Sequence, residues 1–430
     1  MLKVSSLLNI ATKLKNVCSI VNMAGYRQYS QNREAVVFPG IQSHYTEEMV
    51  FSDIQNEEKM DTFRIMNLKG KVINKTMEPD LSNETLVKMY KHCIIHKHMD
   101  KIMHELQRQG RISFYMTSRG EEVLQTGSAA GFHPEDLLFG QYREAGVIFW
   151  RGFSVYDMIS QCYSNNSDLL KGRNMPVHYG SKEHHFVPMS SCLGTQIPHA
   201  VGVAYANKIK NKNLCSGVYF GEGASSEGDA HAAFNFAAVL KCPVIFICRN
   251  NGYAISTPTK DQYSGDGLAA RAKSYGISTI RVDGNDILAM YAATKQAREL
   301  AVKKNKPYFI EALAYRLGDH STSDDSTVYK NAEEQEYWLV QGDPIPRFRK
   351  YLQDKGLWDD KTEESFNKEA KKEVLTAFKK ADKQLKPNPN FMFTDVYKEM
   401  PERLQNQHQD WRKHILENAD KYPLANHDQF

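Results

Sequence analysis

The stretch that decides the fold begins Val218-Tyr219-Phe220-Gly221-Glu222-Gly223-Ala224. It ends, after a helix of small residues, with a second apolar run at 244–248 and Arg249-Asn250-Asn251-Gly252-Tyr253. Strand, glycine-rich turn, helix, strand and polar loop in this order are typical of one βαβ unit in a parallel sheet. We therefore predict an α/β fold, a doubly wound parallel sheet with helices on both faces. Glu222 and Asn251 should lie at the carboxyl ends of neighbouring strands, where such sheets bind ligands.

The residue types at these strand ends suit a phosphorylated ligand. Glycines on both sides of Glu222 let the backbone approach a diphosphate closely. The Glu222 carboxylate and the Asn251 amide offer oxygen ligands for a small divalent cation. Taken alone, Gly-acid-Gly is also the pattern of an ordinary tight turn. Because it is paired with Asn-Asn at the end of the next strand, we favour a magnesium ion that bridges a diphosphate.

The size and charge of the chain exclude several classes of protein. Its 430 residues are enough for one large α/β domain with extensions, or for two ordinary domains. Of these residues 41% are apolar, and they form no continuous run of membrane-spanning length. The formal charge of +4 comes from cations near the N-terminus, without which 51 basic residues balance 51 acidic ones. We expect a soluble protein with no membrane span and no nucleic-acid partner.

The N-terminal segment has the composition of a mitochondrial targeting sequence. It contains no acidic residue before Glu34, carries Lys3, Lys13, Lys15 and Arg27, and mixes serines with Leu, Ile and Val. A cleavage site fits at 27–30, so we predict a transit peptide at 1–30 and a mature protein in the mitochondrial matrix. The alternative is a disordered, slightly basic tail.

The seven cysteines are scattered along the chain, odd in number and without a Cys-x-x-Cys pair. This pattern favours reduced, mostly buried thiols over disulfides or a zinc site.

A long helix is predicted from Ser82 to Gly110, where apolar residues recur at helical spacing between a Ser cap and a terminal Gly. The preceding polar segment should form an extended arm that gains order by lying on something else. His92 and His96 have the i, i+4 spacing of a metal site, but no third ligand is evident. We interpret them as part of a solvated helix face.

Two other segments offer groups for a cofactor. Tyr142 and Arg143 can donate to a diphosphate oxygen, although Arg143 could instead anchor its loop through a salt bridge with Glu144. Residues 189–198, reading Met-Ser-Ser-Cys-Leu-Gly-Thr-Gln-Ile-Pro, open a helix of small residues. Their hydroxyl and amide groups could simply cap the helix. Their oxygens also suit a monovalent cation, and helix N-termini favour cofactor oxygens.

A candidate acid or base follows the last predicted strand. Residues 286–304 predict an amphipathic helix and residues 308–315 a strand. From 318 to 327 there is no aliphatic side chain, which predicts a mobile surface loop. His320 lies in this loop, beyond a strand of the same sheet, and can therefore act as an acid or base.

Together these blocks resemble the alpha subunits of the branched-chain 2-oxoacid dehydrogenase family, which are thiamin diphosphate-dependent decarboxylase components. The similarity runs from about residue 36 to the C-terminus. It includes Arg-Gln-Gly-Arg-Ile-Ser-Phe-Tyr-Met (108–116), Gly-Gln-Tyr-Arg-Glu-Ala-Gly (140–146), Met-Pro-Val-His-Tyr-Gly (175–180), Gly-Glu-Gly-Ala (221–224), Cys-Arg-Asn-Asn-Gly-Tyr-Ala-Ile-Ser-Thr-Pro-Thr (248–259) and His-Ser-Thr-Ser-Asp-Asp-Ser (320–326). The resemblance implies a thiamin diphosphate-binding fold with the diphosphate-binding module on this chain. It also implies a beta subunit that completes an α2β2 heterotetramer, a lipoyl acyltransferase core, and a regulatory kinase and phosphatase.

The resemblance assigns roles residue by residue. The implied cofactor contacts are Tyr142, Arg143, Ser191, Leu193, Gly223, Ala224, Arg249 and His320. The implied magnesium ligands are Glu222, Asn251 and the Tyr253 carbonyl; the implied potassium ligands are Ser190, Cys192, Thr195 and Gln196. His320 would be catalytic in decarboxylation and acyl transfer to lipoamide, and Ser321 would be a regulatory phosphorylation site. Phosphate there, near Asp324 and Asp325, should inactivate by disordering the loop through like-charge repulsion.

Four positions depart from the family pattern. Cys192 stands at a usual Pro, so that a potassium ligand there would be its backbone carbonyl. Arg119 stands at a usual aromatic residue, and Asn331 removes a second phosphorylatable Ser. Asp319 stands at a usual His, which predicts a raised pKa for His320 or repulsion of the diphosphate.

These observations predict four segments: a transit peptide at 1–30, an extended arm at 31–80, a thiamin diphosphate-binding α/β domain at 81–345 and a C-terminal helical extension at 346–430 that packs against a partner subunit. The expected activity is that of a 3-methyl-2-oxobutanoate dehydrogenase (2-methylpropanoyl-transferring). Its substrates would be the branched-chain 2-oxoacids derived from Leu, Ile and Val, and lipoamide would be the acyl acceptor. The alternatives are a pyruvate dehydrogenase alpha subunit and a diverged, non-catalytic paralogue.

Overall fold

The computed structural model describes residues 35–36, 38, 41–53 and 57–429. The chain forms two compact units, Met1–Glu58 and Lys59–Phe430. In the described part of the first unit, an antiparallel bridge joins Ala35 to His44. The predicted transit peptide, 1–30, lies outside the described residues. The second unit contains the sheet and every predicted site residue.

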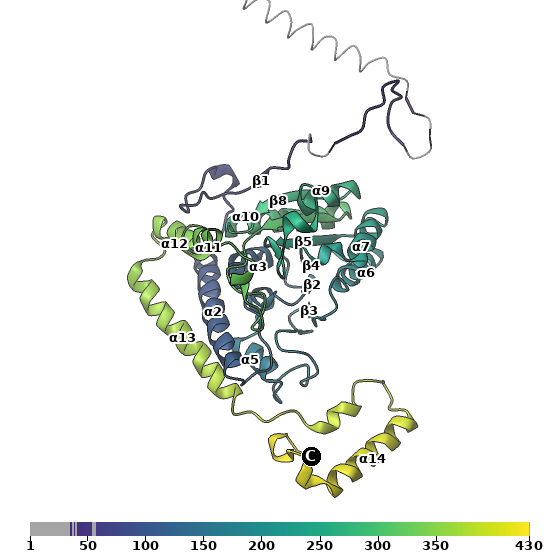
Figure 1. Ribbon diagram of the computed structural model, residues 1–430, viewed down its shortest axis with the longest axis vertical. Helices are drawn as coiled ribbons and strands as arrows, with labels where there is room; N and C mark the ends of the chain where they lie inside the picture. The colour runs from purple at the N-terminus through teal and green to yellow at the C-terminus, as the bar shows by residue number, and fades with distance from the viewer. Residues whose placement is uncertain (1–34, 37, 39–40, 54–56, 430) are drawn as a thin grey trace, which may run out of the picture. The chain divides into compact units, whose positions relative to one another are not determined.

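Strands and helices alternate along most of the second unit (Figure 1). Its strands are β1 (Thr62–Phe63), β2 (Leu137–Phe139), β3 (Phe186–Val187), β4 (Ser216–Gly221), β5 (Val244–Asn250), β6 (Tyr253–Ala254), β7 (Thr257–Pro258), β8 (Ser278–Asp283) and β9 (Tyr308–Leu313). Its α-helices are α2 (Asn83–Arg108), α3 (Glu122–Ala130), α4 (Ala145–Trp150), α5 (Val155–Tyr163), α6 (Gln196–Ile209), α7 (Gly228–Val239), α8 (Thr259–Gln262), α9 (Gly267–Ser274), α10 (Ile287–Lys304), α11 (Ala332–Val340), α12 (Pro344–Asp354), α13 (Asp360–Ala381) and α14 (Glu402–Glu417). Short 3-10 helices are η2 (Lys75–Met77), η3 (Ala224–Ser226), η4 (Ser326–Val328), η5 (Pro389–Phe393), η6 (Ala419–Lys421) and η7 (Leu424–Asn426).

Within the described residues, a 7-stranded sheet runs in the order β1-β8-β9-β5-β4-β2-β3. All of its strand pairs are parallel. The predicted βαβ unit is present, since β4 and β5 pair from Ser216 opposite Val244 to Gly221 opposite Arg249, and α7 connects them. The predicted fold class, a doubly wound parallel α/β sheet, is thereby confirmed.

Helices cover both faces of this sheet, as successive residues of β4 show. Val218 and Phe220 belong to a buried cluster with residues of α6, α7 and α9, whereas Tyr219 belongs to a second cluster with residues of α3 and α10. All three side chains are fully buried. Figure 1 shows α6 and α7 together on one side of the sheet and α3 and α10 on the other. Because both faces of these strands are buried, residues 218–220 of β4 and 244–248 of β5 form continuous apolar runs with no polar alternation.

Helix α2 confirms the helix predicted from Ser82 to Gly110, but the predicted solvated face is wrong for His92 and His96. The Ser82 hydroxyl accepts the Thr85 N–H at 3.2 Å as the N-cap. His92 is only 7% exposed and His96 0%, because α3, α4, α12 and α13 pack around this helix. Burial lowers the pKa of both imidazoles. These histidines are therefore neutral core residues.

The helix predicted at 286–304 and the strand predicted at 308–315 are both confirmed. Helix α10 and strand β9 occupy the predicted segments, and the Asp286 side chain caps α10. The helices beyond β9 include α13, which packs along α2 and α5 (Figure 1). In the segment predicted as an arm, β1 pairs with β8 and adds an edge strand to the sheet.

The six cysteines that lie in the described residues are all unpaired thiols, as predicted. Five are buried, and Cys192 is exposed. Among the described residues, no helix has the length and apolar character needed to cross a membrane.

Candidate active site

Loops that follow four neighbouring strands converge at one end of the sheet. They come after β2, β4, β5 and β9, and they enclose a pocket of about 160 Å³. The predicted site residues that line it are Tyr142, Arg143, Leu193, Glu222, Gly223, Ala224, Arg249, Asn251, Tyr253 and His320. Residues far apart in the sequence are thus brought together where a doubly wound sheet binds its ligand.

The Glu222 carboxylate is buried in the wall of this pocket and is only half satisfied. Its Oε2 accepts the Asn251 N–H at 3.4 Å, whereas its Oε1 has no hydrogen-bond partner in the described part of the chain. Burial, reinforced by the negative charge of Glu121, raises the pKa of Glu222 to about 7. A buried carboxylate oxygen without a partner is costly unless a cation or a proton meets it.

The other two predicted magnesium ligands lie beside Glu222. The Asn251 Oδ1 accepts the Tyr253 N–H at 3.3 Å, and Asn251 Nδ2 donates to Glu121 Oε1 at 2.7 Å. The Tyr253 carbonyl accepts a hydrogen bond from Arg316 at 3.3 Å. Each of these oxygens keeps a lone pair for a metal. The oxygen-only donor set and the orphaned Glu222 Oε1 fit a small divalent cation.

The turn after β4 packs closely against β6, which requires a glycine at position 223. A Cβ at this position would lie 2.7 Å from the Ala254 Cβ. The neighbouring Gly221 N–H donates to the Gln141 side chain at 2.8 Å, which ties the loop after β2 to the end of β4. The turn is thus held where backbone can approach a diphosphate.

Arg249 is held between two buried carboxylates. Its Nε donates to Glu144, and its Nη1 donates to Glu121 Oε2 at 2.7 Å. Although burial opposes the charge, both carboxylates raise the pKa of Arg249. Glu144 Oε2 also accepts the backbone N–H groups of residues 141–143. The alternative of a salt bridge between Arg143 and Glu144 is therefore wrong, since Glu144 pairs with Arg249.

Arg143 contacts His320 directly. One guanidinium nitrogen lies 3.4 Å from His320 Nδ1 and donates to the His320 carbonyl at 2.9 Å, while the other donates to the Thr117 carbonyl. Since guanidinium can only donate, His320 Nδ1 is an acceptor and the proton of the neutral ring sits on Nε2. Burial, together with the charges of Arg143 and Arg316, lowers the pKa of His320 to about 3.

The prediction that Asp319 raises the pKa of His320 is wrong. Its Oδ1 accepts the backbone N–H of Ser326 at 3.0 Å and the Ser326 hydroxyl at 2.5 Å. His320 instead meets Asp324, which accepts the His320 backbone N–H at 2.7 Å. Asp319 holds its own loop through Ser326. At His320, the positive charges of Arg143 and Arg316 lower the pKa more than the negative charge of Asp324 raises it.

The loop at 318–327 is less exposed than predicted. It has no aliphatic side chain to bury, but Thr322 and Ser326 are only 6% and 7% exposed. Hydrogen bonds replace the missing apolar contacts: the Thr322 N–H donates to the Tyr115 carbonyl at 3.2 Å, and Asp319 holds Ser326. Such a loop gains order from polar contacts, which composition alone does not reveal.

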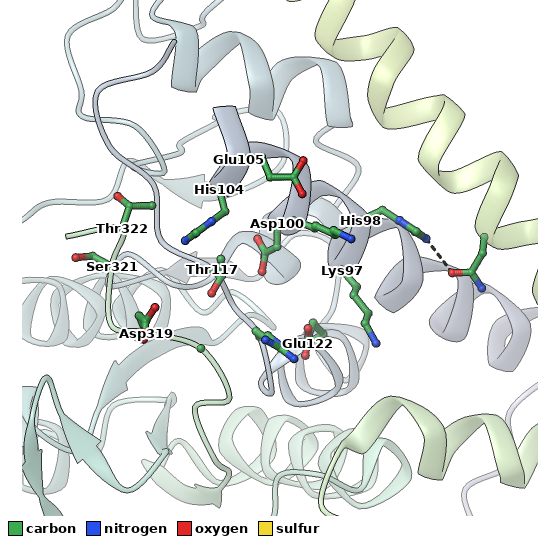
Figure 2. A pocket seen from close by; sticks show the side chains of 14 residues that line it. Lys97, His98, Asp100, His104, Glu105, Thr117, Glu122, Asp319, Ser321 and Thr322 are labelled. Atoms are coloured by element: carbon green, nitrogen blue, oxygen red, sulfur yellow. Dashed lines mark hydrogen bonds between the residues drawn. The ribbon is translucent and has the colours of Figure 1, made fainter. Parts of the chain in front are cut away.

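The same loop separates two pockets. His320 lines the pocket at the end of the sheet, whereas Asp319 and Ser321 on either side of it line a larger pocket of about 570 Å³. Figure 2 shows this second pocket between the loop and α2, with Asp319, Ser321 and Thr322 on one side and Lys97, His98, Asp100, His104 and Glu105 on the other. A group added to Ser321 would therefore enter the second pocket and not the pocket that His320 lines.

Of the six predicted residues at 190–196, five do not line the pocket at the end of the sheet. Ser191 donates to His178 Nε2 at 2.8 Å, because His178 Nδ1 faces the Pro176 carbonyl. The implied potassium ligands Ser190 and Cys192 are exposed, and the Gln196 side chain donates to the Tyr219 carbonyl at 3.1 Å. Leu193 alone of this segment lines the pocket.

Sequence reasoning missed four residues of the site: Gln141, Glu121, Glu144 and Arg316. Arg316 comes directly after the strand predicted at 308–315 and three residues after the end of β9. It lines the pocket and donates to the Tyr253 carbonyl at 3.3 Å. A polar residue directly after a buried strand was the signal that identified Glu222, and the same signal would have found Arg316. Glu121 follows no strand, so only the fold reveals it.

Comparison with known proteins places the chain in a well-defined group. Residues 90–390 match the family model described as the dehydrogenase E1 component. A human protein named 2-oxoisovalerate dehydrogenase subunit alpha, mitochondrial, is 51% identical over 403 residues, which cover 94% of this chain and 91% of that protein. The protein of the same name from Caenorhabditis elegans is 52% identical over 381 residues, covering 88% of each chain. An Arabidopsis thaliana subunit alpha 2 of this enzyme is 44% identical over 420 residues, covering 98% of this chain and 88% of that protein.

Proposed function

Since the chain belongs to the dehydrogenase E1 component family, and within it to the 2-oxoisovalerate dehydrogenase alpha subunits, we propose that it is the alpha subunit of a branched-chain 2-oxoacid dehydrogenase. It acts in the mitochondrial matrix in thiamin diphosphate-dependent oxidative decarboxylation of 2-oxoacids. The observation that carries the proposal is the orphaned, buried Glu222 Oε1 beside Asn251 at the carboxyl end of the sheet.

The pocket offers a clamp for the cofactor's diphosphate. Arg143 and Arg316 line it together with the buried Arg249, and Tyr142 adds a hydroxyl. Arg249 is already paired with two carboxylates, so Arg143 and Arg316 carry more of the charge that a diphosphate would meet. Gly223 and Ala224 would contact it through the backbone, and Leu193 through its side chain. Glu222, Asn251 and the Tyr253 carbonyl would hold Mg²⁺ against its oxygens.

When bound, thiamin diphosphate would supply a carbon nucleophile for the 2-oxo carbon and a positively charged ring as the sink for the electron pair left by carbon dioxide. His320 would serve as the proton carrier beside it, through Nε2. Arg143 donates toward Nδ1 and so keeps this atom unprotonated. Asp324 accepts the His320 backbone N–H and thereby fixes the main chain that carries the ring. The negative diphosphate would offset Arg143 and Arg316 and so raise the pKa of His320 from about 3 toward the range useful for proton transfer.

The potassium site remains a proposal at Ser190, Cys192, Thr195 and Gln196, and Ser191 remains a proposed cofactor contact. To form the potassium site, the oxygens of these residues have to turn toward one ion. In the structure Ser190 and Cys192 are exposed and the Ser190 hydroxyl accepts the Cys192 N–H, while the Gln196 side chain donates to the Tyr219 carbonyl. A beta subunit is the proposed partner that completes an α2β2 heterotetramer and orders this segment. We also propose acyl transfer to a lipoyl acyltransferase.

Regulation is proposed at Ser321. Its hydroxyl accepts the Ser323 N–H at 3.3 Å, and its carbonyl accepts the Asp324 N–H at 3.1 Å. A phosphate of about −2 charge added by a kinase would sit in the second pocket beside Asp319 (Figure 2). Repulsion there would loosen the turn that holds His320, and a phosphatase would restore it.

The two alternatives are not favoured. The relatives described above are named for 2-oxoisovalerate, and a non-catalytic paralogue would not be expected to keep Glu222, Asn251 and His320. The direct test is calorimetric titration of the assembled αβ protein with thiamin diphosphate, with and without Mg²⁺. Magnesium-dependent binding supports the proposal, and no binding in an intact assembly would overturn it.

A further inference from the structure

A buried carboxylate with no role in the family pattern described above links two of the predicted cofactor-site residues. Glu121 is 0% exposed; its Oε1 accepts from Asn251 Nδ2 at 2.7 Å and its Oε2 accepts from Arg249 Nη1 at 2.7 Å. One Glu121 oxygen thus accepts from a guanidinium and the other from an amide NH₂, so both oxygens of this buried side chain act as acceptors.

The backbone around Glu121 is built for this position. Gly120 has φ +96, and a Cβ on it would lie 2.2 Å from the Tyr315 carbonyl oxygen. The Glu121 N–H donates to the Ser118 carbonyl at 2.8 Å, and its own carbonyl accepts the Gln125 N–H at 3.1 Å in the first turn of α3. Glu121 is thereby fixed beside the end of β5.

The contact with Glu121 decides which way the Asn251 amide points. The amide group that faces the carboxylate has to be the donor NH₂, since a carbonyl oxygen there would meet a second acceptor. Asn251 Oδ1 is consequently turned away from Glu121, toward the Tyr253 N–H. With Nδ2 committed, Oδ1 is the atom left for a metal.

We propose that Glu121 is a positioning residue that presents Asn251 Oδ1 to the metal and holds Arg249 at the same time. The inference rests on the proposed function, in which Asn251 is a magnesium ligand. Glu121 itself does not touch the cation. Its loss should weaken metal binding, because outer partners of metal ligands are typically worth about 10–100-fold in affinity.

The experiment uses the assembled αβ protein with thiamin diphosphate and Mn²⁺ as the probe, and it counts free Mn²⁺ by electron paramagnetic resonance without substrate. We expect Glu121→Gln to weaken Mn²⁺ binding about 10–100-fold. In an Asn251→Ala background the same substitution should have little further effect, because it acts through Asn251. Wild-type affinity in an intact Glu121→Gln assembly, or full additivity with Asn251→Ala, would overturn the proposal.

Two further variants separate the possible failures. If Glu222→Gln also leaves Mn²⁺ affinity unchanged, the metal site itself is wrong; if Glu222→Gln abolishes binding and Glu121→Gln does not, only the positioning role is wrong. Should Glu121→Gln fail to assemble, Glu121→Asp carries the same test, since it keeps the charge beside Arg249 but shortens the reach to Asn251. Unchanged affinity in Glu121→Asp would then count against the proposal.

Discussion

Glu222 accepts the backbone N–H of Asn251 at 3.4 Å through one carboxylate oxygen and leaves the other oxygen without a partner in the described part of the chain. This relationship joins the ends of two adjacent strands, β4 and β5, through a single side chain. A protein that buries such an oxygen pays in stability unless a ligand meets it. The proposed magnesium ion would supply this missing partner.

The first prediction concerns this oxygen. Glu222→Gln keeps the shape of the side chain but replaces an anionic metal ligand by a neutral amide, so Mg²⁺-dependent thiamin diphosphate affinity should fall by at least about 100-fold. Calorimetry on the assembled αβ protein measures this. Glu227→Gln, on an exposed residue near the same turn, is the matched control and should bind as wild type. Normal binding by Glu222→Gln would remove this carboxylate from the metal site.

The second prediction concerns His320. His320→Ala removes the imidazole but leaves the backbone contacts with Arg143 and Asp324, so thiamin diphosphate should still bind. Turnover should fall by about 10²–10⁴-fold, the usual contribution of a general acid or base. Steady-state decarboxylation and cofactor titration of the same preparation separate the two effects. Equal loss of binding and turnover would instead indicate a structural role.

The third prediction is a pH dependence that Glu122 imposes on stability. Burial raises the pKa of Glu122 to about 8, with the charges of Asp100 and Asp343 acting in the same direction. The unfolded chain ionises this group near 4.5, so between about pH 4.5 and 8 the folded state binds more protons. Its stability contribution is complete below pH 4.5 and falls as pH rises, by up to about 1.4 kcal/mol per pH unit.

Glu122→Gln mimics the protonated form and should remove this slope. Thermal unfolding at several pH values should therefore show little difference from wild type near pH 5 and a growing advantage for the variant toward pH 8. Glu364→Gln, at an exposed position on α13, is the control and should follow wild type throughout. A variant whose advantage does not change with pH would show that Glu122 is ionised in the fold.

The fourth prediction concerns regulation. Ser321→Glu places a negative charge in the second pocket beside Asp319, and it should reduce turnover at least tenfold by loosening the turn that carries His320. Hydrogen exchange of residues 318–327 should rise in the same variant. Ser323→Glu, at an exposed neighbour, should leave both measurements close to wild type. Intact turnover in Ser321→Glu would contradict the mechanism.

The sequence predicted the sheet and the strand-end ligands because both depend on local patterns. Residues 218–224 and 244–253 contain their own apolar runs and turn residues, so Glu222 and Asn251 could be placed before any contact was known. His320 was found for the same reason. What could not be predicted is which charges meet across the fold. Glu144 pairs with Arg249 and not with its neighbour Arg143, and Asp319 turns to Ser326 and not to His320.

The burial of two histidines of α2 could also not be predicted from the sequence. His92 and His96 carry no pattern that distinguishes them from surface residues, because α2 is covered on several sides by elements distant in sequence. Glu121 was missed because two acidic residues after Gly120 form no recognisable sequence motif. Its role depends on β5, which lies far along the chain.

The measurement that tests the central claim most directly is thiamin- and magnesium-dependent decarboxylation by this chain co-expressed with a branched-chain beta subunit. The quantity to compare is kcat/KM for 4-methyl-2-oxopentanoate and for pyruvate. We predict a clear preference for the branched 2-oxoacid and loss of activity when Mg²⁺ is removed. Preference for pyruvate, or no turnover by a correctly assembled tetramer, would contradict the account.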